Sequence, residues 1–362
     1  MHEPIDPKRK KAKGFFFVLL LLVLGGGGWF YLKERPQPLE PIAVSLVRYQ
    51  EQRPLMGTLA AITVYAESQE KADSAFALAF GRAEAIDQVA SDYLPDSELT
   101  AFNGLAANTW HPASSDFRAM VTYGLELAEI TGGAYDPTLG TMTHLWRETR
   151  KAGRLPTAAT LDGALANAGW EFVEIDEEQG RIRKLRDDLR LDLGGLGKGY
   201  AADQMLNSLQ ASGIQSALVA VGGDVRCGSP PPNKSGWTVG LKNTGNEVAT
   251  TISISDCAVS TSGDLEQFID IEGRRYSHIL DPASGLGLND SLLATVVAPN
   301  GLMADTLATA ACVNPTYFKR LLPETKIHSQ ILSKEQSQVS LGFPLQSPFI
   351  AEDTLGQGQP RS

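Results

Sequence analysis

The residues best suited to chemistry form a glycine-rich segment at positions 192–199, Asp-Leu-Gly-Gly-Leu-Gly-Lys-Gly. Its glycines allow the backbone to approach a ligand closely, and the pattern that follows predicts a helix from Gly199 onward. A helix start presents N–H groups and the positive end of a dipole to an anion, and Lys198 adds a positive charge. The segment favours a phosphate site, although a helix-start turn with an exposed lysine shows the same pattern.

Two familiar phosphate-binding loops do not fit this segment. Gly199 stands where a Walker A loop places Ser or Thr after its lysine. Tyr200 stands where a dinucleotide fingerprint has its third glycine. An anion site at this position is therefore of another kind.

Asp305 and Thr309 are the second candidate pair. They lie four residues apart in a segment whose pattern predicts a helix over 303–313, so their oxygens share one helix face. A carboxylate and a hydroxyl are the hard ligands that Mg²⁺ takes, with waters and substrate phosphates completing the shell. The alternative is an aspartate at a helix start and a threonine that hydrogen-bonds to its own helix.

His278 is the third candidate. It lies in Tyr-Ser-His-Ile-Leu-Asp-Pro at 276–282, where Asp281-Pro282 predicts a turn. A histidine beside a phosphate site can act as a base or bind the phosphate. A purely structural histidine remains the alternative.

These residues depend on elements that the apolar spacing predicts. We expect helices over 70–89, from Ser114 or Ser115 to Gly132-Gly133, over 199–212 and over 303–313. We expect strands over 57–66 and 217–221, and a hairpin made of 237–241 and 250–255. Strands and helices do not alternate regularly, which favours an α+β fold over a doubly wound sheet. A body of about 300 residues is large enough for two lobes.

The composition excludes two broad classes of protein. Of 362 residues, 43% are hydrophobic and 20% are charged, which is typical neither of a disordered chain nor of a multi-span membrane protein. The formal net charge of −10 disfavours phosphate-backbone contacts, so no nucleic-acid partner is expected. Cys227, Cys257 and Cys312 form no Cys-x-x-Cys pair, which indicates buried free thiols, with a bridge between two of them left open.

The N-terminus has the pattern of a membrane anchor. A basic leader over 1–14 precedes an uncharged, largely apolar run over 15–32, which is just long enough to cross a bilayer. The basic cluster is expected in the cytoplasm and the body outside it. A cleaved signal sequence is the rival interpretation, and a buried core helix is a third. We expect a linker over 33–48, a folded body over 49–345 and a flexible tail over 346–362.

Eight short motifs follow one another along the body. They are Met-Gly-Thr at 56–58, Ser-Glu-Leu-Thr-x-x-Asn at 97–103, Gly-Gly-Ala-Tyr-Asp-Pro-Thr at 132–138, the glycine-rich segment at 192–199, Gly-Gly-Asp at 222–224, Thr-Ser-Gly at 261–263, His-Ile-Leu-Asp-Pro at 278–282 and Ala-Asp-Thr-Leu-Ala-Thr-Ala at 304–310. In this order they closely resemble the ApbE family, the FAD:protein FMN transferases. The resemblance covers about residues 50–315.

The resemblance implies a two-lobed, ApbE-like FAD-binding catalytic domain of the α+β class. It implies that FAD is the substrate and Mg²⁺ the cofactor. A threonine hydroxyl of a target protein attacks the FMN phosphorus, AMP leaves, and FMN stays attached through a phosphoester. The implied targets are subunits of membrane redox complexes. An enzyme held by one span in the inner membrane, with its catalytic domain in the periplasm, fits such targets.

The resemblance also assigns roles to residues. It implies that FAD contacts eight of them, namely Met56, Tyr93, Ala134, Tyr135, Asp136, Asp192, Lys198 and Ile279. It implies a metal site made of the Gly195 carbonyl, Asp305 and Thr309. His278 is the first candidate for the base that activates the threonine and a nearby aspartate the second, and Lys198 and Asp192 complete the expected catalytic set. Gly197 is a departure, because the family more often has alanine there.

Three other functions remain open at this point. The same metal site would serve an FAD pyrophosphatase that uses water in place of threonine and releases FMN and AMP. A non-catalytic flavin-binding protein of the cell envelope and an envelope structural protein are the others. Lys198, Asp305 and Thr309 together disfavour these last two, because neither needs a metal site.

Overall fold

The computed structural model describes residues 45–264, 267–290, 292–316, 327–333, 337–339 and 343. The described residues from Leu46 onward belong to one compact unit. The predicted leader over 1–14, the anchor over 15–32, the linker up to residue 44 and the tail over 346–362 lie outside the described residues. Among the helices that are described, none has both the length and the apolar character that crossing a bilayer requires.

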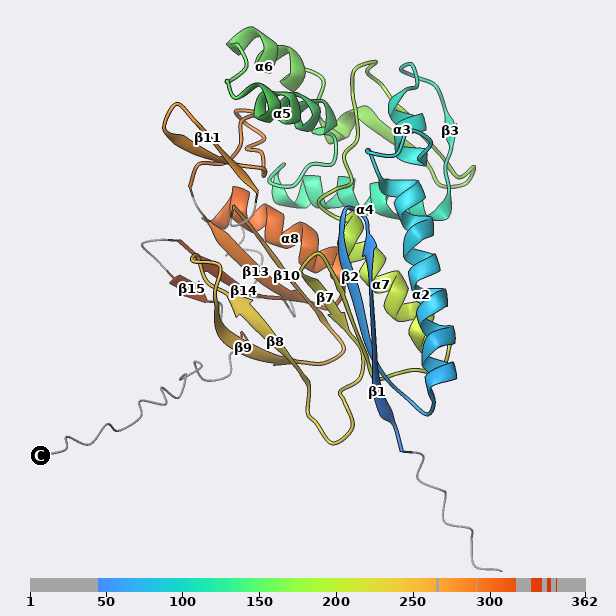
Figure 1. Ribbon diagram of the computed structural model, residues 1–362. Helices are drawn as coiled ribbons and strands as arrows, with labels where there is room; N and C mark the ends of the chain where they lie inside the picture. The colour runs from blue at the N-terminus through green and yellow to red at the C-terminus, as the bar shows by residue number, and fades with distance from the viewer. Residues whose placement is uncertain are drawn as a thin grey trace, which may run out of the picture. The chain divides into compact units, whose positions relative to one another are not determined.

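An eight-stranded sheet forms the centre of the fold (Figure 1). Its strands, in spatial order, are β1 (Val47–Leu55), β2 (Thr58–Ala66), β6 (Ala217–Val221), β7 (Asp224–Cys227), β10 (Ala258–Gly263), β13 (Leu293–Ala298), β14 (His328–Leu332) and β15 (Ser337–Val339). Every neighbouring pair is antiparallel. The antiparallel sheet confirms the α+β class, because a doubly wound fold would have parallel strands.

Three helices cover one face of this sheet: α2 (Gln69–Ala90), α7 (Gly197–Ala211) and α8 (Gly301–Val313) (Figure 1). Helix α7 packs on β6 and β7, α8 packs on β10 and β13, and α2 packs on α7. The alternating side chains of the strands explain this burial, since Ile62 and Val64 of β2 and Val219 of β6 all point into the same core.

A hairpin of β8 (Trp237–Lys242) and β9 (Val248–Ile254) covers part of the other face. Its Trp237 and Ile252 pack in one cluster with Val259 of β10 and Val297 of β13. Strand β13 is consequently buried along its whole length, which explains its continuous apolar sequence.

The remaining elements lie at one end of the large sheet, in the upper part of Figure 1. They are α3 (Glu98–Asn103), α4 (Ser115–Thr131), α5 (Gly140–Ala152), α6 (Ala158–Leu165), a 3₁₀ turn (Trp170–Phe172), a small sheet of β3 (His111–Pro112), β5 (Arg181–Lys184) and β4 (Val173–Asp176), and a hairpin of β11 (Phe268–Ile271) and β12 (Arg274–Ser277). Helices α5 and α6 and this hairpin share a core of their own, which includes Trp146 and Tyr276.

The sequence located the three covering helices and strands β2 and β6, but strands β1, β7, β10, β13, β14 and β15 of the large sheet were not predicted. Ser114 caps α4 by accepting a hydrogen bond from Phe117 N–H, and Gly132 ends it with a φ of 61°. Helix α7 begins at Gly197, two residues before the predicted start. The correction arises because the Gly197 N–H already bonds to the Leu193 carbonyl, so the glycine-rich turn continues directly into the helix. Lys198 therefore stands in the first turn of α7.

Candidate active site

Helices α7 and α8 meet at two glycines. A Cβ on Gly199 would lie 2.2 Å from the carbonyl oxygen of Gly301, and a Cβ on Gly301 would lie 2.4 Å from that of Gly199. Neither position accepts a side chain unless the helices move apart. This contact brings the first turn of α7 against the N-terminal half of α8, where Asp305 lies.

Lys198 lies between two buried carboxylates at this contact. Its Nζ is 3.3 Å from Oδ2 of Asp305 and 3.2 Å from Oδ2 of Asp224, the first residue of β7. The backbone N–H of Gly199 donates to the same Asp305 oxygen at 3.0 Å. The side chains of Asp305 and Asp224 are only 4% and 7% exposed. The anion that the start of α7 attracts in this structure is thus a carboxylate of the protein itself.

Burial and the neighbouring carboxylates shift the pKa of Lys198 in opposite directions. Burial alone lowers the pKa of Lys198, but the Asp224 and Asp305 carboxylates outweigh it and raise that pKa above its ordinary value. The pKa of Asp305 is raised to about 7, because burial and the like charge of Asp224 together outweigh Lys198 and the Gly199 N–H. Lys198 is therefore protonated at neutral pH, and an added cation beside Asp305 would stabilise its ionised form.

Asp224 and Ser260 belong to the site although they were not among the predicted site residues. Ser260 of β10 donates a hydrogen bond to Oδ1 of Asp224, which leaves Oδ2 facing Lys198. Taken alone, Gly222-Gly223-Asp224 has the pattern of a turn with a polar residue, although it is also one of the eight motifs of the family resemblance. Asp224 becomes a candidate site residue only because the neighbouring strands bury its carboxylate beside Lys198.

The three residues predicted for the metal lie together. Asp305 and Thr309 are one helical turn apart, and Oγ1 of Thr309 donates to the Asp305 main-chain carbonyl at 3.3 Å, which is the hydrogen bond within the helix that the alternative interpretation expects. A Cβ on Gly195 would lie 4.0 Å from that hydroxyl, so the Gly195 backbone borders it. Ser262 of β10 places its Oγ 3.2 Å from the same hydroxyl.

This donor set suits one kind of ion. A carboxylate, a hydroxyl and a main-chain carbonyl are hard oxygen donors, and they are too few to complete an octahedron without waters or phosphates. Among the described residues, no group of three or more His, Cys, Asp or Glu side chains is placed to hold a metal. The residues present therefore fit Mg²⁺ shared with a phosphate-bearing ligand better than an ion held by protein alone.

Tyr135 forms a wall of the site. Its ring lies against Gly195, where an added Cβ would be 3.1 Å from the ring edge. Its hydroxyl is buried and has no hydrogen-bond partner among the described residues. Burial raises its pKa well above the ordinary value, so the hydroxyl keeps its proton. A buried, unpaired hydroxyl of this kind is a donor for a ligand.

The residues beside Tyr135 are also buried. Ala134 is 7% exposed, and it packs in the core. The Asp136 carboxylate accepts hydrogen bonds from the Thr138 N–H at 2.8 Å and the Thr138 hydroxyl at 2.6 Å. Burial raises the pKa of Asp136. One oxygen of Asp136 thus accepts both hydrogen bonds and stabilises the turn that follows Tyr135.

Met56 borders the glycine-rich segment through a strained turn. It has a φ of 51° and Gly57 has a φ of 67° in the two-residue turn between β1 and β2. A left-handed conformation is unusual for methionine, and such strain is concentrated at functional sites. The methyl group of Met56 would be 3.5 Å from a Cβ on Gly197. The alanine that the resemblance implies at this position would therefore contact Met56 without a clash.

Tyr93 and Asp192 are joined through Arg147 of α5. The Arg147 guanidinium lies over the Tyr93 ring, 4.4 Å from its centroid, and pairs with Asp92. Its second nitrogen is 4.0 Å from Asp192. Tyr93 is 77% exposed, so its outer face is open to a ligand. Arg147 was not predicted, because nothing in its local sequence separates it from the other basic residues of α5.

His278 follows β12 in an open but concave position. More than a third of the His278 surface is exposed. The protein around the rest of the ring lowers the pKa of His278 through burial, and the positive charges of Lys198 and Arg150 lower it further. Its Nδ1 lies 3.2 Å from the Gln267 carbonyl oxygen, which can only accept, so Nδ1 carries the proton. The other ring nitrogen, Nε2, is then the basic one.

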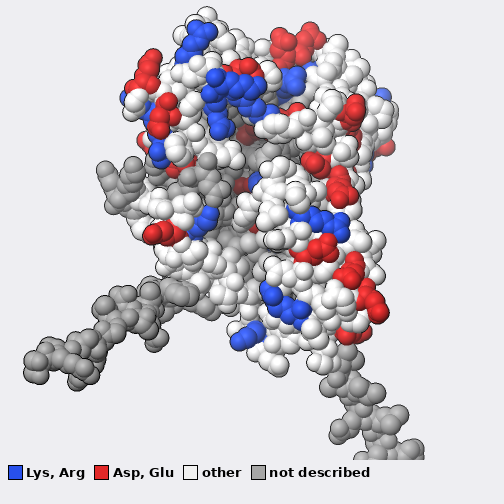
Figure 2. Space-filling view, viewed as in Figure 1, with Lys and Arg blue, Asp and Glu red and all other residues white. Residues whose placement is uncertain are grey.

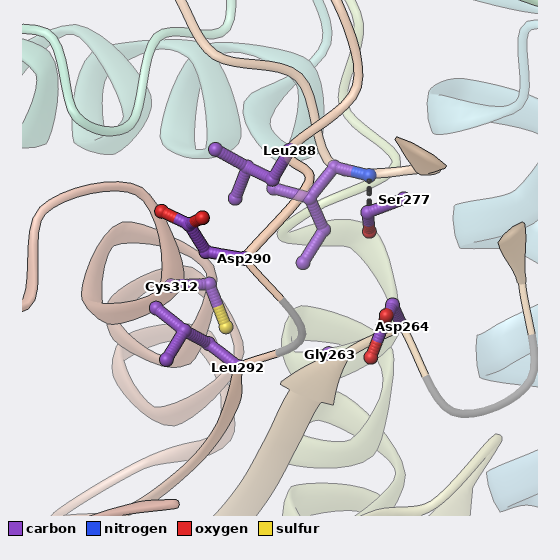
Figure 3. Close-up of a pocket in the computed structure, with 8 residues that line it drawn as sticks. Gly263, Asp264, Ser277, Leu288, Asp290, Leu292 and Cys312 are labelled. Carbon is purple, nitrogen blue, oxygen red and sulfur yellow. Dashed lines mark hydrogen bonds between the residues drawn. The ribbon is translucent and has the colours of Figure 1, made fainter. Parts of the chain in front are cut away.

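Ile279 turns inward beside His278. It is 7% exposed and lines a small pocket with Gly263, Asp264, Ser277, Leu288, Asp290, Leu292 and Cys312, which has room for about one water molecule (Figure 3). Figure 3 shows the hydrogen bond from the Ile279 N–H to Ser277 Oγ, at 3.1 Å. Ile279 therefore positions the segment that carries His278.

The face of the molecule drawn in Figure 2 is hollowed near its centre. Figure 2 shows the hollow between the part of the molecule that holds α5 and α6 and the part that holds the large sheet. Basic and acidic side chains are both visible in it (Figure 2). A substrate of mixed charge would find complementary groups here.

Comparisons with known proteins identify the family of the chain. The sequence profile of the ApbE family matches residues 56–328. The chain is 30% identical over 266 residues to the FAD:protein FMN transferase of Salmonella typhimurium, covering 71% of this chain and 76% of that protein. It is 30% identical over 285 residues to the protein of the same name from Treponema pallidum, covering 73% and 78%.

Two solved structures share the fold. The flavin transferase ApbE from Vibrio cholerae aligns with a TM-score of 0.75 and 25% identity, over 82% of this chain and 98% of that one. The ApbE protein from Thermotoga maritima aligns with a TM-score of 0.75 and 28% identity, over 82% and 97%. The profile match, the relatives and the fold agree, and the chain belongs to the ApbE family of flavin-transferring enzymes.

Proposed function

We propose that this protein transfers FMN from FAD to a threonine hydroxyl of a target protein, with Mg²⁺ as cofactor and AMP as the leaving group. The observation that carries the proposal is the Lys198–Asp305 contact of 3.3 Å at the start of α7. The Thr309 hydroxyl, which donates to the Asp305 main-chain carbonyl, and the Gly195 backbone that borders this hydroxyl support a shared site. The names of the relatives support the transfer of FMN from FAD to a protein.

The charges of the site match a diphosphate. Two adjacent phosphates repel an attacking oxygen, and Lys198 together with the positive end of the α7 dipole offsets that charge. Asp305, Thr309 and the Gly195 carbonyl would hold Mg²⁺, which supplies Lewis-acid stabilisation of the phosphate oxygens and of departing AMP. Asp224 would hold the Lys198 ammonium group in place while the Asp305 carboxylate binds Mg²⁺.

His278 is the proposed base. Because Nδ1 donates to the Gln267 carbonyl, Nε2 can accept the proton of the threonine hydroxyl. The threonine oxygen then forms its bond to the FMN phosphorus, and the bond from that phosphorus to the AMP oxygen breaks. The lowered pKa of His278 keeps the imidazole neutral at pH 7, as a base requires.

Aromatic and apolar groups would hold the flavin end of the substrate. Tyr93 presents an exposed face, Tyr135 a buried unpaired hydroxyl, and Met56 a methyl group at the edge of the glycine-rich segment. The turn of Asp136 sets the position of Tyr135. These groups supply the mixture of stacking and hydrogen bonding that a ring with polar edges needs.

The experiment mixes the full-length protein with FAD, Mg²⁺ and a membrane extract from its native cells. Denaturing gels and intact-mass measurement detect FMN on a protein, and chromatography measures AMP. AMP in equal amount to protein-bound FMN supports the transfer. AMP with free FMN alone indicates the pyrophosphatase, and intact bound FAD without AMP indicates a binding protein.

We also propose that residues 15–32 anchor the enzyme in the inner membrane, with the body in the periplasm. The basic cluster before an uncharged apolar run supports this orientation. A membrane redox subunit with an acceptor threonine would then be within reach. Fractionation of cells and protease treatment of spheroplasts test the proposal, which predicts a membrane-bound protein whose body is cleaved from outside.

A further inference from the structure

Two cysteines face each other across neighbouring strands, away from the proposed metal site. Cys227 ends β7 and Cys257 immediately precedes β10, and the register of Arg226 with Ala258 places them opposite each other. The Cys227 N–H donates to the Cys257 carbonyl at 3.0 Å, and the Cys227 thiol approaches the same carbonyl at 3.4 Å. Both are free thiols, as is Cys312.

The backbone here can accommodate a bridge. Directly opposed residues in antiparallel strands have Cα atoms about 4.5–5.5 Å apart, which lies within the range of about 4.4–6.8 Å that disulfides span. The two thiols also interact with each other. Closing the bond needs rotation of both side chains and a small approach of the two strand ends, because Cβ atoms joined by a disulfide lie about 3.5–4.5 Å apart.

The two thiols differ in ways that favour stepwise oxidation. Cys257 is partly exposed and Cys227 is fully buried. The hydrogen bond from the Cys227 thiol, followed by the nearby positive charge of Arg226, lowers the pKa of Cys257, whereas the same pairing and burial raise that of Cys227. Cys257 is thus the accessible, more acidic thiol and Cys227 the inner one.

We propose that Cys227 and Cys257 are a modification site, which forms a reversible disulfide by exchange with a disulfide reagent of a small thiol or of a dithiol protein. The Cys257 thiolate attacks one sulfur of the reagent, whose S–S bond breaks and whose second sulfur leaves as a thiol. Cys227 then loses its proton and attacks Sγ of Cys257, releasing the other thiol. The pair loses two electrons and two protons, and the reagent gains them.

The bond would brace the strands that support the site. Cys227 ends the strand that begins with Asp224, and Cys257 lies three residues before Ser260, the hydrogen-bond donor to Asp224. Arg226 between them also binds Asp203, whose carboxylate accepts from the first N–H groups of α8. Closing the pair therefore restricts β7 and β10 at their far ends, and we expect higher thermal stability without a change in the site itself.

The test uses the full-length protein, which contains three cysteines. It is equilibrated with mixtures of reduced and oxidised glutathione, quenched with acid, unfolded and alkylated. We expect two thiols to disappear together while one remains, a peptide that links Cys227 to Cys257, and a melting temperature several degrees higher in the oxidised form. Cys312→Ala is the matched control and should still close the bridge.

A second variant keeps the test independent of misfolding. Cys257→Ser changes a partly exposed position, and the resulting protein should keep both remaining thiols after the same treatment and show no oxidation-dependent melting temperature. The proposal is wrong if three thiols remain alkylatable in the native sequence at every glutathione ratio. A glutathione adduct that persists on Cys257, or a bridge that includes Cys312, overturns it equally.

Discussion

Lys198 and Asp305 are 107 positions apart in the sequence, and their charged groups lie 3.3 Å apart at the contact of α7 and α8. The contact depends on Gly199 and Gly301, which lack the Cβ atoms that would separate the helices. The buried Asp224 adds a second carboxylate to the same ammonium group. The site therefore combines two carboxyl groups with one ammonium group. A divalent cation would offset the negative charge that Lys198 leaves unbalanced.

Replacing Asp305 tests the metal site. We expect Asp305→Asn to lose FMN transfer by on the order of 100-fold or more at ordinary Mg²⁺ concentrations, because it removes the only carboxylate among the proposed ligands. Chelation of Mg²⁺ in the unchanged protein should produce the same loss, reversed by adding the ion back. The variant should stay folded, since the substitution removes the repulsion between Asp305 and Asp224. Full activity in the variant would contradict the site.

Asp224 tests whether Lys198 must be held in place. Asp224→Asn should reduce transfer by ~10–100-fold, the range seen when a supporting residue behind a metal site is lost. Ser260→Ala removes only the hydrogen bond to the other Asp224 oxygen, so its effect should be smaller. Steady-state kinetics with FAD measures both variants. An equal loss in the two would show that strand packing, and not the ion pair, is responsible.

The pH dependence tests the role of His278. Its pKa is lowered from an ordinary value of 6.5, so the neutral base is present at pH 7 and disappears as the pH falls through the lowered value. The acidic limb of the kcat/KM profile should therefore lie below pH 6.5. His278→Gln should lose about 10²–10⁴-fold in rate and lose that limb as well. A variant with an unchanged profile would exclude the histidine as the base.

The helix contact can be tested with two glycines. Gly199→Ala should destabilise the protein by about 1–3 kcal/mol or more and abolish transfer, because its Cβ would lie 2.2 Å from the Gly301 carbonyl oxygen. Gly81→Ala is the matched control, since it lies in α2 with nothing within 4 Å of the added Cβ. It should gain about 0.5–1 kcal/mol and keep full activity. Urea denaturation measures both changes.

Tyr135 tests the inference that a buried hydroxyl awaits the substrate. Tyr135→Phe removes a hydroxyl that has no hydrogen-bond partner among the described residues, so the free protein should become more stable by about 1 kcal/mol. Affinity for FAD should fall, because the ligand would lose a donor. Thermal unfolding with and without FAD separates the two effects. A lower stability of the free variant would show that the hydroxyl is already paired.

The local pattern of the sequence was sufficient for the three helices that cover the large sheet and for two of its eight strands. Strand β2, helix α4 and strand β6 are where apolar spacing and capping residues predict them, because alternation and capping act over a few residues. Strand β1 was not predicted. It lies at the edge of the sheet with many exposed side chains, so its sequence lacks the apolar alternation that marks a buried strand, and its pairing with β2 supplies the missing information.

The sequence by itself determined which chemical groups are available: a lysine after a run of glycines, an aspartate and a threonine one helical turn apart, and a histidine before a turn. Only the tertiary structure decided that the lysine lies beside the helix that carries the aspartate and the threonine. The partners of Lys198 come from β7 and α8, and Arg147 comes from α5 to join Tyr93 with Asp192. Such contacts arise from packing between distant segments, and burial then changes the pKa of groups such as Asp305 in ways that no local pattern contains.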